Sequence, residues 1–486
     1  MLGFSRERLT SKSRFVLGRV LLLFLVIVST ATELRSAALS SVLIRGVPHV
    51  RQKPDFCGEA CAEMYLRKLR VPIDQDGVFD LSRLDPTLGR GCYTRDLMQA
   101  LGAIGFKIGL ARYEIPVRSA ASKLNEEFAA LHADLVAGVP SIVCMRFDEQ
   151  PKTTEHFRLV LGYDAKSDEV IYHDPALASG AYRRMIRSRF LDLWPLKHDD
   201  EKWTIVRLRL ETGSPLHAVR TPARSRNAEY AQHVRKLRAR LPEGGFSIVV
   251  QKPFVVIGDE PADSVKDRAR DTVQWAVDRL KRDYFDQDPS DILDIWLFRD
   301  SVSYEEHAEK LFGTKPSTPY GYYSPRDRAL VMNIATGGGT LVHEIVHPFM
   351  ASNFPECPAW FNEGLASLYE RPSERAGHII GLTNWRLKGL QRALRKGTVP
   401  TFKTLCETTT HEFYDQDRGT NYGQARYLCY YLQEQGLLVK FFHAFRKNVA
   451  ADPSGYETLK SILGEEAMTK FQERWQAYTL KLTFGD

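Results

Sequence analysis

Hydrophobic residues recur along the chain with two periods, which predict a mixture of strands and helices. Alternating or continuous apolar runs are typical of strands, whereas apolar residues three and four positions apart are typical of helices. Predicted strands cover residues 155–163, 169–174, 203–210, 246–250, 254–258 and 292–298, with two more around a turn within 320–333. Predicted helices begin near Cys57, cover 227–241, 261–284 and 304–312, and take up almost all of the chain from Thr340 on. This pattern indicates an α+β protein.

The order of these elements indicates two domains. With 486 residues, of which 43% are hydrophobic and 26% charged, the chain has enough apolar mass for two cores. We expect a first domain over residues 42–212, a basic linker and helix over 213–245, and a second domain over 246–486 that starts with a small sheet and continues as helices. The basic face of the linker helix favours a solvated helix over one that binds phosphate or membrane.

The first 31 residues, 1–31, are typical of a secretory signal peptide. Five basic side chains precede Val20–Val28, an unbroken apolar run of nine residues, and a small-residue cleavage candidate follows. The run is short for a membrane span, which needs about 20 apolar residues, so an uncleaved anchor is the alternative. Removal of these residues lowers the formal net charge from +7 to about +3, because five basic and one acidic side chain are lost. We therefore expect an exported protein that touches a membrane only if this segment is retained, and no nucleic-acid partner.

The clearest candidate for a metal site is formed by His343, Glu344 and His347 in a predicted helix. Residues four apart lie on one face of a helix, so the two imidazoles can hold one Zn²⁺ ion, with Glu344 beside them to take a proton from a metal-bound water. Glu363 lies 16 residues after His347 in a second apolar-periodic run and can supply the third ligand. The other positions of the first helix are apolar, which argues against a surface helix that carries these residues by chance.

This pattern resembles the gluzincin metallopeptidases, especially their peptidase-MA-like branch. There the His-Glu-x-x-His helix is followed by a second motif, whose residue types stand here at Pro358, Trp360, Glu363, Gly364 and Ala366. The resemblance implies a mainly helical zinc domain with a small sheet, in which His343, His347 and Glu363 bind zinc. It also implies that Glu344 is the general base. Pro348 departs from the pattern, because a proline directly after His347 can kink or end the helix.

Tyr422 is a further candidate in the second domain. It lies near the start of a predicted helix over 421–435, which is similar to a Tyr-x-Gln-Ala helix of the same branch. Its hydroxyl can donate a hydrogen bond to the oxyanion that forms when a carbonyl is attacked. A packing role for the ring is the alternative.

Cysteine usage points to a second kind of chemistry, in the first domain. Seven cysteines are too few for a disulfide scaffold, and their odd number leaves at least one thiol unpaired, while the pairing of the others stays open. Cys57 stands apart because it lies at or near the start of a predicted helix, where the helix dipole lowers the pKa of a thiol. A nucleophilic cysteine also needs a base and an orienting group, which are usually distant in sequence.

His156 and Asp174 meet that need. They lie at the start and end of two strands, 155–163 and 169–174, whose short connection predicts a hairpin that brings both side chains together. Gln52, shortly before Cys57, can donate its amide to an oxyanion. His173 is expected to face solvent, and it is the alternative base.

These residues resemble the papain-like cysteine peptidases that process bacteriocin leaders after a double glycine, over roughly residues 45–200. The resemblance implies Cys57 as nucleophile, His156 as base and Asp174 as the group that orients it. It also implies Gln52 as oxyanion donor, although Gln52 precedes Cys57 by five residues where the family usually has six. No transporter sequence follows, so we do not expect leader processing coupled to secretion.

Together these patterns predict an exported peptidase with a papain-like domain followed by a gluzincin-type zinc domain. Its partners are peptide or protein substrates and its cofactor is Zn²⁺. In the alternative, the first domain binds peptides without cleaving them and only the zinc site is active. In a third reading neither site is active, and the protein has a structural role in the cell envelope.

Overall fold

The structure is a computed structural model that describes residues 39–213, 216, 226–242, 244–416 and 420–485. The predicted signal peptide and residues 217–225 of the expected linker lie outside these ranges. The chain divides into two compact units, formed by Met1–Leu84 with Gly91–Ser225 and by Asp85–Arg90 with Arg226–Asp486. Within the described ranges, no helix combines the length and the apolar character that a membrane crossing requires.

The first unit contains an antiparallel sheet with the strand order β3-β8-β4-β5-β6-β7, to which β1 adds by pairing with β5. The strands are β1 (Val42–Leu43), β3 (Arg112–Pro116), β4 (Ser141–Arg146), β5 (Glu155–Asp164), β6 (Glu169–His173), β7 (Arg183–Ile186) and β8 (Lys202–Arg209). Two short strands, β2 (Phe106–Lys107) and β9 (Glu211–Thr212), form a separate pair.

The β5–β6 hairpin confirms the two strands predicted around the candidate base. The connection turns at Asp168, whose φ is 51°, and the Asp168 carboxylate accepts a hydrogen bond from the Tyr163 hydroxyl at 2.6 Å. Leu159 stands opposite His173 in the strand register. The start of β5 and the residue after β6 therefore lie at the same end of the hairpin, which brings the His156 and Asp174 backbones close together.

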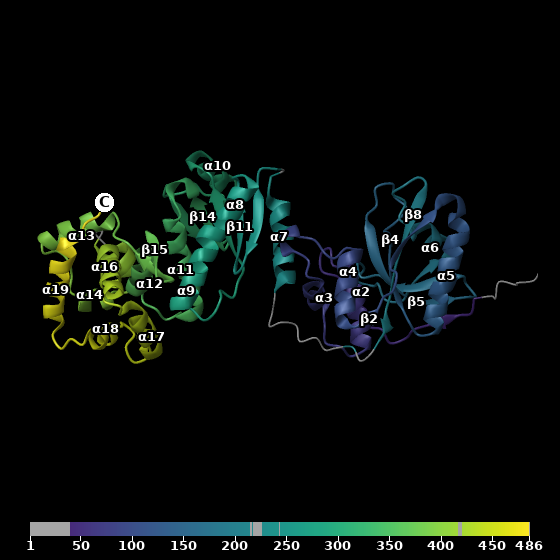
Figure 1. Ribbon diagram of the computed structural model, residues 1–486, viewed down its shortest axis with the longest axis horizontal. Helices are drawn as coiled ribbons and strands as arrows, with labels where there is room; N and C mark the ends of the chain where they lie inside the picture. The colour runs from purple at the N-terminus through teal and green to yellow at the C-terminus, as the bar shows by residue number, and fades with distance from the viewer. Residues whose placement is uncertain (1–38, 214–215, 217–225, 243, 417–419, 486) are drawn as a thin grey trace, which may run out of the picture. The chain divides into compact units, whose positions relative to one another are not determined.

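Helices cover both faces of this sheet. They are α2 (Cys57–Lys68), α3 (Gln75–Ser82), α4 (Thr94–Ile104), α5 (Ala120–Val136) and α6 (Arg187–Leu193), with 3₁₀ turns at Val117–Ser119 in this unit and at Pro86–Leu88 in the other. Figure 1 shows α2 and α4 on one side of the sheet and α5 on the other. Helix α2 packs against β5, so the first residue of α2 and the first residues of β5 share one region of the fold.

The second unit begins with a five-stranded sheet in the order β10-β11-β12-β14-β13. Its three inner strands are parallel, and both edge strands pair antiparallel with their neighbours. The strands are β10 (Ser247–Gln251), β11 (Phe254–Gly258), β12 (Leu293–Phe298), β13 (Gly321–Ser324) and β14 (Ala329–Asn333). These bounds agree closely with the predicted strands. Short apolar runs that lack helical spacing are predicted as strands with few alternatives.

Helix α7 (Asn227–Arg240) belongs to the second unit, whereas its composition favoured a solvated helix between the domains. Tyr230, Val234 and Leu237 are buried against a cluster that includes Val255 and Trp296 of the sheet. The basic side chains occupy the opposite, exposed face. The helix has five buried positions, whose helical spacing is visible in the sequence. The sequence does not show that a sheet covers them.

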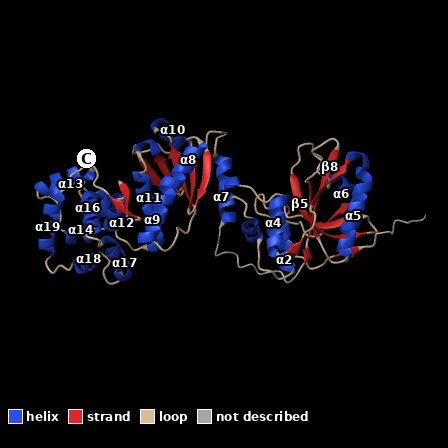
Figure 2. Cartoon of the chain, viewed as in Figure 1, coloured by secondary structure: helices blue, strands red, loops and turns tan. Residues whose placement is uncertain are grey.

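The remainder of the second unit is mainly helical, as Figure 2 shows. The helices are α8 (Ala262–Arg268), α9 (Trp275–Asp283), α10 (Ser301–Phe312), α11 (Gly339–Asn353), α12 (Ala359–Leu368), α13 (Arg386–Arg395), α14 (Phe402–Cys406), α15 (Thr410–Asp415), α16 (Asn421–Glu434), α17 (Leu438–Asn448), α18 (Tyr456–Leu463) and α19 (Met468–Lys481). A π-helical segment (Ala269–Gln274) joins α8 to α9, so the long helix predicted over 261–284 is continuous. One hairpin of β15 (Pro372–Arg375) and β16 (His378–Gly381) interrupts the helical half.

Helix α12 is buried along its whole length and is held by α16. Gly364 allows the close approach, because a Cβ there would lie only 3.1 Å from both the Ala425 carbonyl oxygen and the Cys429 sulfur. The fully buried Arg426 donates hydrogen bonds to the carbonyls of Ser367 (2.9 Å) and Leu368 (3.3 Å). Those carbonyls lie at the C-terminal end of α12 and have no partner inside the helix. The position of α12, and of the carboxylate it carries, is therefore set by a second helix far along the chain.

Candidate active sites

Cys57 is the first residue of α2, as the sequence predicted. The chain turns into the helix at Asp55, whose φ is 68°, and the amide of Phe56 donates to the carbonyl of Lys53 at 3.0 Å. The Phe56 ring is fully buried and stacks on Phe79 at a centroid distance of 5.0 Å. A buried aromatic anchor directly before Cys57 therefore fixes where the helix begins.

The environment of the Cys57 thiol differs from the sequence-based expectation. Burial raises the pKa of this thiol to about 12, and the nearby carboxylates of Glu59 and Asp55 raise it as well. The backbone amides of Phe157 and Gly58 lower it, but less than burial raises it. The predicted lowering of the thiol pKa by the helix start is therefore wrong for the resting protein, because desolvation of the thiolate outweighs the helix dipole. Cys57 is protonated at neutral pH and needs a base.

His156 and Asp174 form the hydrogen-bonded pair that the hairpin predicted. Their side chains are both buried, and His156 Nε2 lies 2.8 Å from Asp174 Oδ1. The second carboxylate oxygen accepts a hydrogen bond from Arg158 Nε at 2.9 Å. Burial alone would raise the pKa of Asp174, but the hydrogen bonds and charges of His156 and Arg158 outweigh it and hold the pKa at about 2. Asp174 is therefore ionised and fixed between two partners.

Arg158 was missed by the sequence analysis. It lies two residues after His156 on β5, so both side chains project from the same face of the strand. Besides Asp174, its guanidinium donates to the carbonyls of Phe147 (2.9 Å) and Arg146 (3.3 Å). The sequence signal for Arg158 was its position two residues after His156 in an apolar strand. A buried arginine in such a strand needs an acidic partner, and Asp174 was already predicted to lie near His156.

The structure brings two of the four predicted thiol-site residues into direct contact. Among the described residues, no hydrogen bond joins the Cys57 sulfur to His156; the sulfur lies by the backbone amide of the next residue, Phe157. The Gln52 amide nitrogen donates to the carbonyl of Pro175 at 2.9 Å, beside Asp174, and the buried side-chain oxygen of Gln52 has no partner. The unpartnered atom is an acceptor, whereas an oxyanion would be bound by the Nε2 donor of the same side chain.

His173 is fully buried, which overturns the expectation that it faces solvent. Its ring packs edge-on against Tyr182 at a centroid distance of 4.5 Å and against His49 at 5.7 Å. Burial lowers its pKa to about 4, and the neighbouring His49 contributes in the same direction. Because His156, not His173, holds the Asp174 carboxylate, His173 is a packing residue of the hairpin.

Asp174 is expected to make folding stability fall in strong acid. Its pKa drops from 3.8 to about 2 on folding, so the unfolded chain takes up a proton at a higher pH than the folded protein does. The stabilisation is complete above about pH 4 and is lost as the pH falls through about 2, with a size of roughly 2 kcal/mol. Urea unfolding between these pH values should show this loss in the native protein and not in Asp174→Asn.

The matched control for that experiment is Asp200→Asn, which changes an exposed carboxylate of the same unit. It should keep the pH dependence of the native protein. An unchanged pH dependence in Asp174→Asn would show that the His156 and Arg158 contacts do not stabilise the charged carboxylate.

His343, His347 and Glu363 converge in the second unit. One ligand atom from each of the three lies within 4.8 Å of the others. The two Nε2 atoms are 3.2 Å apart, and the Glu363 oxygens lie 3.5 Å from His343 Nε2 and 3.9 Å from His347 Nε2. Helix α11 runs through Pro348 to Asn353, so the proline does not end the helix at the second histidine. The three predicted ligands therefore come together from two adjacent helices.

The outer nitrogen of His347 has a hydrogen-bond partner, whereas that of His343 is buried without one and has the Glu370 carboxylate as a neighbour. His347 Nδ1 lies 3.1 Å from Asn362 Oδ1, and His343 Nδ1 lies 3.7 Å from Glu370 Oε1. The Glu370 carboxylate is held by Arg386, with 2.6 Å and 2.9 Å contacts, and by Asn384 at 2.8 Å. The sequence analysis found neither partner. Asn362 stands next to Glu363 in the motif, whereas Glu370 lies past the end of α12 and only the fold shows its direction.

A cavity of about 400 Å³ opens at this cluster, and Glu344, His347 and Glu363 all line it. Burial raises the pKa of Glu344, and the carboxylates of Glu363 and Glu370 act in the same direction. Tyr323 of the edge strand β13 and Tyr414 of α15 complete the rim. The predicted base therefore borders open space that a substrate can enter.

Tyr414, rather than Tyr422, supplies the hydroxyl at this site. The Tyr414 hydroxyl donates to Glu363 Oε1 at 2.7 Å, and Tyr414 lines the cavity. The Tyr422 ring packs against Phe413 at 5.2 Å and lies under the Arg386 guanidinium at 5.0 Å. Tyr422 is not among the described residues that line the cavity. Tyr414 carried no motif, and only the packing of α15 beside α12 reveals its role.

All seven cysteines are free thiols, including the five that the sequence placed in apolar contexts. A second cavity, of about 670 Å³, is lined by three of them, Cys57, Cys92 and Cys144. The candidate nucleophile therefore also borders open space, in the first unit.

Comparison with known proteins supports the N-terminal part of this picture. Residues 44–199 match the family described as the Peptidase_C39 like family. The solved peptidase domain of Streptococcus ComA, a bi-functional ABC transporter involved in a quorum sensing pathway, is similar with 16% sequence identity and a TM-score of 0.23; the similarity covers 34% of this chain and all of that one. No curated protein matches. The family match supports a peptidase of the cysteine class in this part of the chain.

Proposed function

We propose that this protein hydrolyses peptide bonds at Cys57 in its first unit. The single observation that carries this proposal is the family match over residues 44–199 together with the buried His156–Asp174 pair inside it. The match does not favour the alternative in which this unit only binds peptides. The test is peptide cleavage by protein with and without Cys57, in a background that lacks Glu344.

His156 is the base of this site. Its Nε2 is committed to Asp174, which leaves Nδ1 as the ring nitrogen that can take the thiol proton. The thiol of Cys57 transfers its proton to that nitrogen as its sulfur attacks the peptide carbonyl. The imidazolium then gives the proton to the leaving amine as the C–N bond breaks, and water hydrolyses the acyl-enzyme that remains. Asp174, ionised at neutral pH, stabilises the imidazolium that results. Catalytic hydrogen bonds are often long before substrate binds, so the missing sulfur–imidazole contact fits a resting enzyme.

A second hydrolytic centre is proposed at His343, His347 and Glu363, with Zn²⁺ as its cofactor. Tetrahedral zinc holds its ligands at about 2.0–2.2 Å, so neighbouring ligand atoms lie roughly 3.3 Å apart. The 3.2 Å between the two Nε2 atoms and the 3.5 Å between His343 Nε2 and Glu363 Oε2 are close to this requirement. Glu363 Oε2 is buried without a hydrogen-bond partner, which a cation between the three residues would supply. Three protein ligands leave one position open, as in catalytic rather than structural zinc sites.

The chain's own groups around that position suit acyl hydrolysis. Bound zinc would supply a Lewis acid that polarises a carbonyl and activates water. Glu344 accepts the proton of the attacking water at its carboxylate and can pass it to the leaving amine. The Tyr414 hydroxyl, at the rim of the cavity, is placed to donate to the developing oxyanion. The substrates of both centres are peptides or proteins, and export through residues 1–31 belongs to the same proposal.

Glu370→Gln is expected to weaken zinc binding by roughly 10–100-fold, the usual effect of losing a partner of a ligand histidine. The carboxylate lies 3.7 Å from the unpartnered His343 Nδ1, and we expect it to accept a hydrogen bond from that nitrogen when zinc is bound at Nε2. Zinc affinity is measured by competition with a chromophoric chelator. Glu356→Gln, an exposed change between α11 and α12, is the matched control and should bind zinc normally. Equal zinc affinity in Glu370→Gln and Glu356→Gln would show that Glu370 binds Arg386 but does not contribute to zinc binding.

A further inference from the structure

One row of side chains runs across four strands and forms the floor of the cavity beside Cys57. Phe157 of β5 pairs with Cys144 of β4, Cys144 pairs with Val206 of β8, and Val206 pairs with Arg112 of β3. All four residues line the same cavity of about 670 Å³. The row therefore begins at Phe157, whose backbone amide lies by the Cys57 sulfur, and ends at the guanidinium of Arg112.

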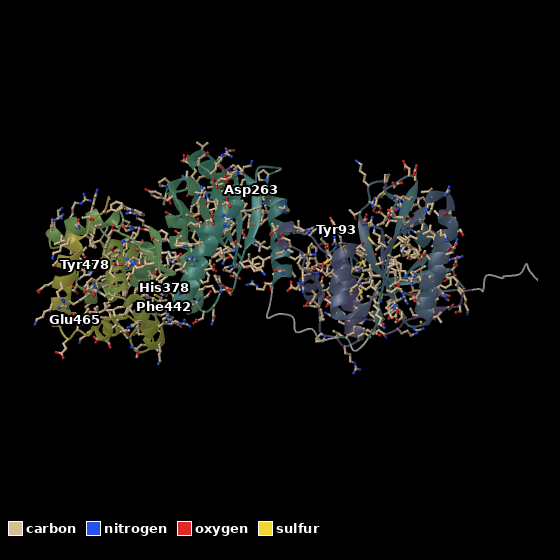
Figure 3. All side chains as sticks on the ribbon, in the orientation of Figure 1. Tyr93, Asp263, His378, Phe442, Glu465 and Tyr478 are labelled. Carbon is tan, nitrogen blue, oxygen red and sulfur yellow. The ribbon has the colours of Figure 1, made fainter. Side chains whose placement is uncertain are left out.

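Two arginines of this cavity have no acidic partner. Arg112 lies at the far end of the row, and Arg95 lies in the first turn of α4, near Tyr93, which is labelled in Figure 3. Both are exposed, and within the described residues neither forms a salt bridge. Most other arginines that line strands of this unit are paired, as Arg207 and Arg209 are with Asp134.

The acidic side chains of the cavity do not neutralise these two arginines. Glu155 is held by His198 at 2.6 Å and by the Cys144 thiol at 3.7 Å. Asp55 lies at the opposite end, next to Cys57, and accepts the amide of Gly91 at 3.0 Å. The cavity thus has the reacting thiol at one end and the unpaired positive charge of Arg112 at the far end of the row, and Arg95 is a second unpaired cation that lines it.

We propose that Arg112, in the cavity that Arg95 also lines, forms a subsite for a carboxylate of the peptide that Cys57 cleaves. This inference rests on the proposed cysteine peptidase function and adds the substrate class. A guanidinium binds a carboxylate through two parallel hydrogen bonds, and a second cation in the same cavity strengthens the attraction. The carboxylate is either an acidic side chain or the free C-terminus of the peptide, since both present the same group.

The strand spacing predicts how far this carboxylate lies from the scissile bond. Neighbouring strands are about 4.8 Å apart, so three steps from β5 to β3 cover roughly 14 Å. An extended peptide advances about 3.3 Å per residue, and this distance corresponds to about four residues. Allowing for the length of an arginine side chain, the carboxylate belongs about three to five residues from the bond that is cleaved.

Peptide binding tests the subsite without depending on catalysis. The protein is the full chain with Cys57→Ala and Glu344→Gln, and the probes are fluorescein-labelled decapeptides with amidated C-termini. One set carries a single glutamate at each position in turn, and a matched set carries glutamine instead. A third set has no acidic side chain but a free C-terminus. Fluorescence anisotropy gives the dissociation constants.

We expect one glutamate position, or the free C-terminus, to tighten binding by about tenfold over its uncharged counterpart. Arg112→Gln should remove most of that preference and Arg95→Gln a smaller part of it, and both should leave the binding of uncharged peptides unchanged. Arg118→Gln, an exposed change outside the cavity, should have no effect. Arg112→Glu should shift the preference to a lysine at the same position.

Two outcomes would overturn the subsite. Either no position prefers glutamate to glutamine and the free C-terminus adds nothing, or the preference survives Arg95→Gln, Arg112→Gln and their combination. Cleavage of the same unlabelled peptides by protein with Cys57 intact reports separately on the proposed function. A carboxylate preference in binding without any cleavage would support the subsite and contradict the peptidase proposal.

Discussion

Protein that carries Glu344→Gln should still cleave peptides, and adding Cys57→Ala should remove that cleavage. In a nucleophile–base–acid site, loss of the nucleophile lowers turnover by about 10⁴-fold or more, because the acyl-enzyme cannot form. His156→Ala should cost about as much as Cys57→Ala, and the two together little more, since the residues act as a unit. Turnover of internally quenched peptides at neutral pH measures all three.

Cys61→Ala is the matched control for the thiol. Cys61 lies one turn later on the same helix, is fully buried, and its sulfur contacts the Phe157 carbonyl at 3.6 Å. Its loss should change the rate only a few-fold. If cleavage persists in the protein that lacks both Cys57 and Glu344, the first unit does not use Cys57 and the proposal fails.

The raised pKa of Cys57 can be tested separately by measuring how fast the thiol is alkylated at different pH values. Because the thiol pKa is raised to about 12, little thiolate exists at pH 7 in the absence of substrate. Alkylation of Cys57 by iodoacetamide, followed by mass spectrometry, should therefore be slow at pH 7 and rise about tenfold for each pH unit toward pH 10. Fast alkylation at pH 7 that does not depend on pH would instead indicate a thiolate–imidazolium pair in the resting protein.

In protein that carries Cys57→Ala, Glu344→Gln should abolish the remaining cleavage and leave zinc bound. Glu344 lines the cavity with His347 and Glu363 but is not one of the three convergent ligand residues. A general base contributes about 10²–10⁴-fold to the rate, and glutamine has nearly the same shape but cannot accept the proton. Atomic emission for zinc and cleavage rates on the same samples separate binding from catalysis.

Two comparisons complete this experiment. His343→Ala should lose both the metal and the cleavage, whereas the exposed change Glu356→Gln should lose neither. Zinc that is retained while cleavage is unchanged would remove Glu344 from the mechanism. A protein that holds no zinc in any variant would remove the second hydrolytic centre altogether.

Local spacing accounts for most of what was predicted correctly. His343 and His347 are four residues apart, so any helix through them presents both rings on one face, and α11 does so even with Pro348 inside it. The hairpin around His156 and Asp174 follows from two apolar runs and a short connection, and its register brings the two side chains to 2.8 Å. Cys57 begins α2 because a polar turn and then the buried Phe56 come before it.

The errors arise where a neighbour comes from a distant part of the chain. Tyr422 belonged to a recognisable pattern, but the packing of α15 brings Tyr414 to Glu363 instead. Arg158 and Glu370 carried no motif, and they matter because the fold turns them toward Asp174 and His343. Helix α7 has a basic face typical of a solvated helix, yet a sheet covers its apolar face.

By itself, the sequence determined the elements and the groups that can react, because strand and helix periods and the spacing of ligands are local properties of the chain. The tertiary structure alone decided the pKa values of those groups and which residues lie near them. Burial raises the pKa of Cys57 although it begins a helix, since desolvation depends on everything packed around the sulfur. The same holds for the row from Phe157 to Arg112, because β8 and β3 are far in sequence from the β4–β5 pair and become its neighbours only after folding.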